Sequence, residues 1–205
     1  MNSPPATVFV VDDDDAVRNS LRLLLKSVEL PVALFASAQE FLAAYRMDQP
    51  GCLVLDIRMP GMSGLDLQRD LSLRGAIIPI VFITGHGDVP MAVDAMQQGA
   101  FDFLQKPFRD QDLIDRVQRA FEKDATSRRA LAEVGRIREL FESLTARERE
   151  VLALVTSGKA NKVIAAELDV SPRTVEIHRA RVMEKMEAPS LAALVRMVLD
   201  LERPR

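Results

Sequence analysis

Five polar residues follow short apolar runs in the first part of the sequence: Asp12, Asp13, Asp56, Thr84 and Lys106. Carboxylates that lie together form an oxygen-only site, the kind that Mg²⁺ or Mn²⁺ prefers. A threonine hydroxyl can donate to a phosphoryl oxygen, and a lysine ammonium group is a compact charge for the same anion. The residue types therefore indicate phosphate chemistry assisted by a divalent cation.

Each of these residues, taken singly, also has a simpler interpretation. Asp56 could cap a turn, Thr84 could be a turn residue, and Lys106 could be a surface cation. The run of consecutive aspartates could be a solvated turn in which Asp14 or Asp15 caps the next helix. The chemical interpretation requires that all the apolar runs end at one edge of the same sheet.

The apolar runs have the composition of buried strands, and helical patterns separate them. The run CLVL, for example, shows no polar alternation, which suits a strand covered on both faces. The alternation predicts an α/β fold with a parallel sheet between layers of helices, and ligands bind at the carboxyl edge of such sheets. We expect strands at 7–11, 31–35, 52–55, 79–84 and 100–106, and helices at 16–28, 37–45 and 65–73.

Composition indicates two domains of opposite charge. The 205 residues are 48% apolar, enough for two small cores. Residues 1–124 hold 12 Lys and Arg against 18 Asp and Glu, a net charge of −6, whereas residues 125–205 hold 15 against 12, a net charge of +3. An acidic half joined to a basic half suggests a metal or phosphate module attached to a domain that binds a polyanion.

Several classes of protein are excluded by what the sequence lacks. Cys52 is the single cysteine, so no disulfide can form within the chain, and a reducing compartment fits. No apolar run approaches the roughly 18 residues of a membrane span, and the first residues lack a secretory pattern. We therefore expect a cytoplasmic protein with no membrane contact. Cys/His zinc spacing and a glycine-rich phosphate loop are also missing from the sequence.

A helical stripe of apolar residues leads from the first domain to the second. It runs from Leu113 to Leu144, and Gly135 is its weakest point, at a cost of about 1 kcal/mol relative to Ala. We expect one long helix whose stripe serves as a dimer or docking surface. A flexible linker is the alternative.

Residues 143–186 read as three short helices. Thr145 and Glu148 form a capping box at the start of the first helix. Asn161 begins the second, and Ser171 caps the third. Two short helices joined by a tight turn form a helix-turn-helix, which presents its later helix to the major groove of DNA. We expect the inward residues of the second and third helices to be Val163, Ile164, Leu168, Val175, Ile177, Val182 and Met186.

Polar and basic residues cover the outer face of the third helix and the loop before the second. Arg and Lys there can contact phosphates or guanine edges, and Thr or Val can meet a thymine methyl group. An ordinary solvated face is the alternative, and Glu176 lowers the positive charge. A fourth helix at 191–201 could close the domain or dimerise it. The candidate DNA contacts are Lys159, Asn161, Lys162, Arg173, Thr174, Val175, His178, Arg179, Arg181 and Lys185.

On these motifs the chain resembles a known family. Residues 5–122 resemble the receiver domain of two-component response regulators. Residues 143–186, through LTAREREVL and TVEIHR, resemble the LuxR-type DNA-binding domain. Together they are similar to the FixJ/NarL group, and the segments GHGDVPMAV and QKPF favour FixJ. The resemblance implies a receiver at 1–122, a helical linker at 123–142 and a LuxR-type helix-turn-helix domain at 143–205.

The resemblance also implies roles for the residues. The sheet would be flavodoxin-like, with five parallel strands in the order 2-1-3-4-5. Asp56 would accept a phosphoryl group from a sensor histidine kinase, and Thr84 and Lys106 would contact that group. Phe103 would be the switch aromatic, and the Lys106–Pro107 peptide would be cis. Mg²⁺ or Mn²⁺ would be held by Asp12, Asp13, Asp56 and the backbone carbonyl of Arg58.

Phosphorylation would bring two copies together as a homodimer on double-stranded promoter DNA and regulate transcription, with RNA polymerase as a further partner. The chain would catalyse only its own phosphorylation and dephosphorylation. Arg58 and His86 flank the site and could admit or exclude the hydrolytic water, although His86 could also be a plain turn residue.

Two other functions are possible. A Mg²⁺-dependent phosphohydrolase would form an aspartyl phosphate as a turnover intermediate, but such enzymes usually carry an acid/base aspartate where this chain has Arg58. An effector that binds RNA or protein through the last helices is the third possibility. Salt-dependent binding to duplex DNA would distinguish it from the first.

Overall fold

The computed structural model describes residues 5–85 and 89–202. The chain divides into two compact units, Met1–Arg128 and Arg129–Arg205, and each is described by itself. None of the described helices is long and apolar enough to cross a membrane.

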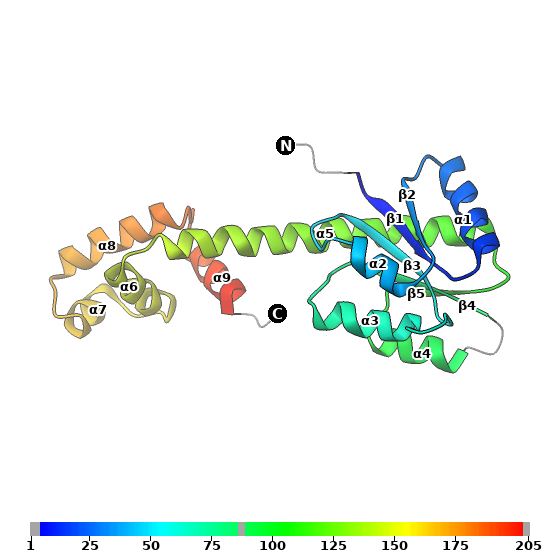
Figure 1. Cartoon of the computed structure of the whole chain (residues 1–205). Helices are drawn as coiled ribbons and strands as arrows, with labels where there is room; N and C mark the ends of the chain where they lie inside the picture. Colours follow the sequence, from blue (N-terminus) through cyan, green and yellow to red (C-terminus); the bar gives the residue numbers. More distant parts are fainter. Residues whose placement is uncertain (1–4, 86–88, 203–205) are drawn as a thin grey trace. The chain divides into compact units, whose positions relative to one another are not determined.

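The first unit is built on a five-stranded parallel sheet in the order β2-β1-β3-β4-β5, which confirms the expected strand order (Figure 1). The central strand β3 is buried along its whole length, as its unbroken apolar run predicts. The strands are β1 Thr7–Val11, β2 Val32–Phe35, β3 Gly51–Asp56, β4 Ile80–Thr84 and β5 Asp102–Gln105.

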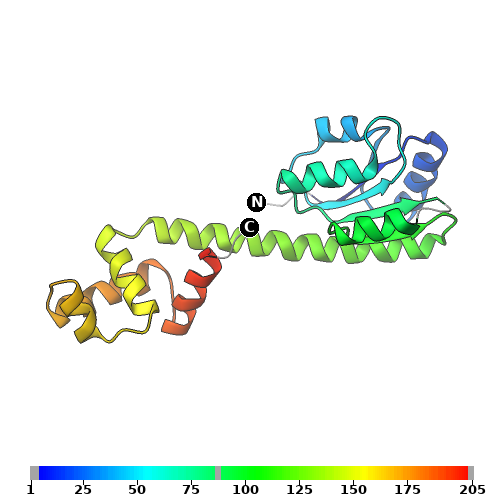
Figure 2. The same cartoon turned by 90° about the horizontal axis from the view of Figure 1, so that it is seen from below.

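Helices cover both faces of this sheet (Figure 2). The side chains of its strands alternate between two cores. Phe9, Leu55 and Phe82 point to the core under α2, α3 and α4. Val10 and Val54 point to the core under α1 and the first part of α5. The helices are α1 Asp15–Ser27, α2 Ala38–Ala44, α3 Gly64–Leu73, α4 Val89–Gln97 and α5 Asp110–Glu142.

Local signals in the sequence fix the ends of these elements. Asp14 caps α1 by accepting from the backbone N–H groups of Ala16 and Val17, so one of the consecutive aspartates has the capping role. At the start of β3, Gly51 has a φ of +156°, and a Cβ there would lie 2.1 Å from the carbonyl oxygen of Thr7. Only glycine allows the neighbouring strand to approach this closely.

The second unit packs four further helices and the end of α5 around one core. Thr145 and Glu148 form the expected capping box of α6, and Ser171 caps α8. The helices are α6 Ala146–Thr156, α7 Asn161–Glu167, α8 Pro172–Lys185 and α9 Leu191–Glu202. Since α5 is helical throughout 110–142, the segment 123–142 is helix and not a flexible linker.

Two residues predicted to be inward are on the surface of the second unit. Val163 is 47% exposed and Ile177 is 44% exposed, whereas Ile164, one position after Val163, and Val175, two positions before Ile177, are fully buried. Each residue of a helix is rotated by about 100° from the one before, so the positions one and two residues from a buried residue point away from the core. In a helix as short as α7, the sequence pattern alone does not decide between the two.

Candidate functional site

The carboxyl edge of the sheet brings together the ends of β1, β3, β4 and β5. The ammonium group of Lys106 lies there between two carboxylates, with its Nζ 2.9 Å from Oδ1 of Asp56 and 3.0 Å from Oδ2 of Asp12. Thr84 ends β4 and is buried, and its carbonyl oxygen accepts from the backbone N–H of Lys106 at 2.7 Å. The Lys106–Pro107 peptide is cis, as expected. Four of the five polar residues that follow the apolar runs therefore converge.

Backbone donors hold the remaining oxygens of the two carboxylates. Oδ2 of Asp56 accepts from the N–H of Arg58 at 2.7 Å, and Oδ1 of Asp12 accepts from the N–H of Asp14 at 2.8 Å. Asp12 is 2% exposed and Asp56 is 9% exposed. Both carboxylates are thus fixed in orientation while Asp56 keeps a small opening to solvent.

Burial and charge act in opposite directions on this cluster. Burial raises the pKa of Asp56, and the hydrogen bond and charge of Lys106 offset that rise only in part. Burial lowers the pKa of Lys106, but its hydrogen bonds to Asp56 and Asp12 outweigh that effect and leave the pKa raised. The lysine is therefore held as a cation beside a carboxylate that is more basic than usual.

The donor chemistry of this edge suits a hard divalent cation, and two of the three expected carboxylates, those of Asp12 and Asp56, meet at Lys106. Among residues 5–85 and 89–202, no three His, Cys, Asp or Glu side chains are close enough to hold an ion together. Asp12 and Asp56 are buried against Lys106, whereas Asp13 is exposed at the rim. All the candidate ligands carry oxygen, so the set fits Mg²⁺ or Mn²⁺ in chemistry.

The consecutive elements α4 and β5 both carry exposed apolar side chains. Phe103 of β5 is 36% exposed, and Val93 and Met96 of α4 are 49% and 39% exposed. The positions of Phe82 and Phe103 are paired in the register of β4 and β5. His86 lies outside the described residues.

Many of the candidate DNA contacts in the second unit are engaged with other residues of the unit. Arg179 donates to Oδ1 of Asn161 at 2.7 Å and so links α8 to α7. Lys159 forms an ion pair with Glu167 at 2.7 Å. Such pairs reduce the charge that these residues present to a polyanion.

Two of the residues predicted to contact DNA, Val175 and Lys185, are instead packed or hydrogen-bonded within the unit. The side chain of Val175 is fully buried, so the prediction that it meets a thymine methyl group is wrong. Lys185 donates to Oε2 of Glu148 at 2.7 Å, and Glu148 is only 3% exposed. This hydrogen bond and those from Thr145 lower the pKa of Glu148 to about 2.

The other candidates lie along α8 and at the start of α7. Arg173 pairs with Glu176 at 3.3 Å, and the hydroxyl of Thr174 is 2.8 Å from that of Ser171. Nδ1 of His178 is buried without a hydrogen-bond partner among the described residues. Lys162 and Arg181 are exposed, and neither has an ion pair within the described part of the chain.

One buried polar cluster was not predicted from the sequence. Asp124 of α5 is 2% exposed and accepts from the N–H of Gly51 at 3.0 Å and from Nε of Arg128 at 2.8 Å. Arg128 also donates to the carbonyl oxygens of Met47, at 3.0 Å, and Gln49. The sequence shows an Asp and an Arg four residues apart on a predicted helix, a spacing that allows an ion pair. It contains no signal that this pair contacts the start of β3.

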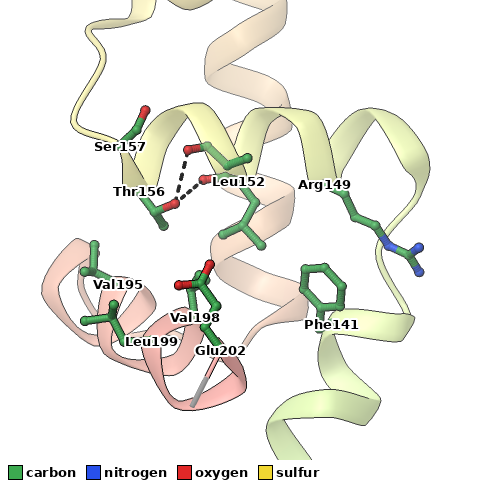
Figure 3. Close-up of a pocket in the computed structure, with 10 residues that line it drawn as sticks. Phe141, Arg149, Leu152, Thr156, Ser157, Val195, Val198, Leu199 and Glu202 are labelled. Carbon is green, nitrogen blue, oxygen red and sulfur yellow. Dashed lines mark hydrogen bonds between the residues drawn. The ribbon is translucent and has the colours of Figure 1, made fainter. Parts of the chain in front are cut away.

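A surface groove of about 410 Å³ lies within the second unit between α6, α9 and the end of α5 (Figure 3). Its floor is apolar, and Arg149 and Glu202 stand among its lining residues. In α9, Leu194 is buried in the core while Leu199 beside the groove is 54% exposed. α9 therefore packs on the core and closes the unit, which is one of the two roles expected for the fourth helix. It also leaves exposed apolar side chains beside the groove.

Comparisons with known proteins match both units. Residues 8–118 match the family described as response regulator receiver domain, and residues 142–198 match bacterial regulatory proteins, luxR family. The chain is 52% identical over 195 residues to nodulation protein W of Bradyrhizobium diazoefficiens, across 95% of this chain and 86% of that protein. It is 50% identical over 195 residues to transcriptional regulatory protein FixJ of Azorhizobium caulinodans, across 94% and 91%. The solved structure of response regulator StyR is similar with a TM-score of 0.84 at 48% identity, across 96% of this chain and 99% of that one.

Proposed function

The chain belongs to the two-component response regulators that join a receiver domain to a LuxR-type DNA-binding domain, and on that basis we propose that phosphorylation of Asp56 switches its binding to promoter DNA. A sensor histidine kinase supplies the phosphoryl group. The observation that carries the proposal is the ammonium group of Lys106 held within 3.0 Å of both Asp56 and Asp12 at the carboxyl edge of the sheet.

The chemistry follows from this arrangement. A carboxylate oxygen of Asp56 attacks the phosphorus of a phosphohistidine in line, so that an O–P bond forms while the P–N bond breaks and the imidazole leaves. Lys106 balances negative charge on the phosphoryl oxygens, and the hydroxyl of Thr84 donates to one of them. The same site releases phosphate when water attacks the aspartyl phosphate, so the chain catalyses only its own modification.

Mg²⁺ or Mn²⁺ would be held by Asp12, Asp13, Asp56 and the backbone carbonyl oxygen of Arg58. When bound, the ion adds positive charge against the phosphoryl oxygens. Asp13 is exposed, so packing does not prevent its side chain from turning toward the ion. Buried Asp12 supplies an oriented oxygen ligand at the end of β1.

The output is a change in the surface of the receiver. Movement of Thr84 toward the phosphoryl oxygen draws Phe103 inward and alters the exposed apolar surface formed with Val93 and Met96 of α4. That surface then forms a homodimer, which brings two DNA-binding domains onto paired half-sites. The dimer regulates transcription with RNA polymerase. We expect this activity in the cytoplasm, where promoter DNA and a phosphoryl donor are both present.

The test uses the full chain with BeF₃⁻ and Mg²⁺ as a phosphoryl mimic. Light scattering should report a dimer, and a gel shift should report tighter binding to duplex DNA. Asp56→Asn should abolish both responses, whereas Asp48→Asn, which changes an exposed carboxylate of the same unit, should leave both intact. Equal responses of the native chain and Asp56→Asn would refute the assignment of Asp56.

A further inference from the structure

Arg18, the fourth residue of α1, reaches back from the helix to the end of β1. Its Nη1 donates to the backbone carbonyl oxygen of Asp12 at 2.6 Å, and its Nη2 forms an ion pair with Asp15. The side chain of Arg18 is 11% exposed, whereas that of Asp15 is 85% exposed. Because an ion pair with so exposed a partner contributes little, the contact with buried Asp12 is the one that fixes the guanidinium group.

The carbonyl group that Arg18 contacts belongs to the peptide unit that joins Asp12 to Asp13. It lies beyond Val11, the last residue of β1 in register with β2 and β3. Since a peptide unit is planar, a donor that fixes its oxygen also fixes the direction in which the backbone enters Asp13. Arg18 therefore orders the turn between two of the proposed ligands of Mg²⁺ or Mn²⁺.

The stability of α1 does not explain an arginine at this position. α1 begins at Asp15, so Arg18 lies near the amino end of the helix, where the helix dipole disfavours a cation. Side chains of a helix lean toward its amino end, and this direction brings the guanidinium group of Arg18 to the Asp12 carbonyl. Arg22, one turn later, instead contacts Asn19 of the same helix, at 3.3 Å.

We propose that Arg18 is a positioning residue for the divalent cation, because it holds the peptide unit between Asp12 and Asp13 in the orientation that lets both carboxylates bind one ion. This inference rests on the cation site proposed above. Asp12 is already oriented by its side-chain contacts, but Asp13 is exposed and depends on its backbone for direction. Without Arg18 this direction has to be fixed when the ion binds, and affinity falls.

An effect of charge alone would have the opposite sign. The guanidinium group repels a divalent cation, so its removal would strengthen binding if Arg18 acted only through its charge. The double variant Arg18→Ala/Asp15→Asn removes one charge of each sign and leaves the net charge unchanged. We expect it to bind Mn²⁺ about tenfold more weakly than the native chain, as is typical when a group that orients a metal ligand is lost.

The test titrates Mn²⁺ into the full chain without a phosphoryl donor and measures free Mn²⁺ by electron paramagnetic resonance. Asp12→Asn should abolish binding, which identifies the site. Arg18→Lys keeps the charge and one donor group, and should bind more tightly than the double variant. Arg22→Ala removes an equal charge from the same helix without touching the Asp12 carbonyl, and should not weaken binding. Thermal unfolding verifies that each variant is folded.

Phosphorylation by acetyl phosphate gives a second measurement. In the double variant the Mg²⁺ concentration at half-maximal rate should rise about tenfold, in line with the loss of affinity, while KM for acetyl phosphate stays at its native value. A purely structural role of Arg18 would lower the unfolding temperature without separating these two quantities.

Equal or tighter Mn²⁺ binding by the double variant would overturn the inference, provided that Asp12→Asn still abolishes binding, and the proposed cation site would then stand. A rise in KM for acetyl phosphate alone would also overturn it, because Arg18 would then act on the phosphoryl group. Native binding that Asp12→Asn does not change would refute the proposed cation site together with the inference.

Discussion

Nζ of Lys106 lies 2.9 Å from Oδ1 of Asp56, although 50 positions separate the two residues. The parallel sheet explains this proximity, because β3 and β5 end at the same edge. The contact makes the ionisation of Asp56 depend on the positive charge of Lys106.

Replacement of that cation should change the acidity of the nucleophile. Burial raises the pKa of Asp56, and Lys106 is the largest effect that lowers it. In Lys106→Gln the pKa of Asp56 should therefore rise further, because the adjacent positive charge and its hydrogen bond are lost. A ¹³C NMR titration of the aspartate carboxyl groups measures this. Lys26→Gln, a change in α1, should leave the titration of Asp56 unchanged, and an unshifted Lys106→Gln would contradict the prediction.

The cluster of Asp124, Arg128 and Gly51 should contribute strongly to the stability of the first unit. Asp124→Ala leaves the N–H of Gly51 and the guanidinium of Arg128 without their buried acceptor. Breaking a buried ion pair in this way typically costs about 3 kcal/mol. Urea unfolding of the full chain should show this loss in the first unit's transition. Glu122→Ala, two positions earlier on the exposed side of α5, should change it by less than about 0.5 kcal/mol.

Signals within a few residues of each other made most of the fold predictable. The unbroken apolar run before Asp56 identified a buried strand, and Thr145 with Glu148 identified the start of α6. The convergence of Asp12, Asp56, Thr84 and Lys106 followed from strand ends alone, since parallel strands share an edge. The buried strand and the start of α6 were predictable because their signals lie within a few consecutive residues.

Partners far apart in the sequence could not be predicted. Oε2 of Glu148, which accepts from Thr145 nearby, also accepts from Lys185, 37 positions later, and Asp124 accepts from the N–H of Gly51, 73 positions earlier. For Val175 and Ile177, a pattern of alternating apolar residues did not fix which one enters the core. Only the packing of α8 against α6 and α7 decides that.

The stability of the second unit should depend on the ionisation of Glu148. Its pKa of about 2 in the folded unit lies below the ordinary value of 4.5, so the folded state binds the proton more weakly than the unfolded state. The resulting stability is present above pH 4.5 and is lost as the pH falls toward 2.

Glu148→Gln should therefore unfold more easily than the native chain at neutral pH, by about 2 kcal/mol for a charged hydrogen bond, and should lose less stability between pH 4.5 and 2. Denaturant unfolding at several pH values measures both effects. Glu150→Gln changes an exposed glutamate of the same helix and should follow the native pH dependence. An identical pH dependence in Glu148→Gln would show that the pair with Lys185 carries no such coupling.

Lys162 and Lys185 should differ in their effect on DNA binding, although both are lysines of the helix-turn-helix. Lys162 is exposed and has no ion pair among residues 129–202, whereas Lys185 is bound to buried Glu148. Each phosphate that a cation neutralises contributes about 0.9 to the slope of log K against log salt concentration. Lys162→Gln should reduce the slope by about that amount, and Lys185→Gln should leave it unchanged while it destabilises the second unit. Fluorescence anisotropy over a series of KCl concentrations measures the slopes. If Lys185→Gln reduced the slope as much as Lys162→Gln, Lys185 would have to leave Glu148 and contact a phosphate in the complex.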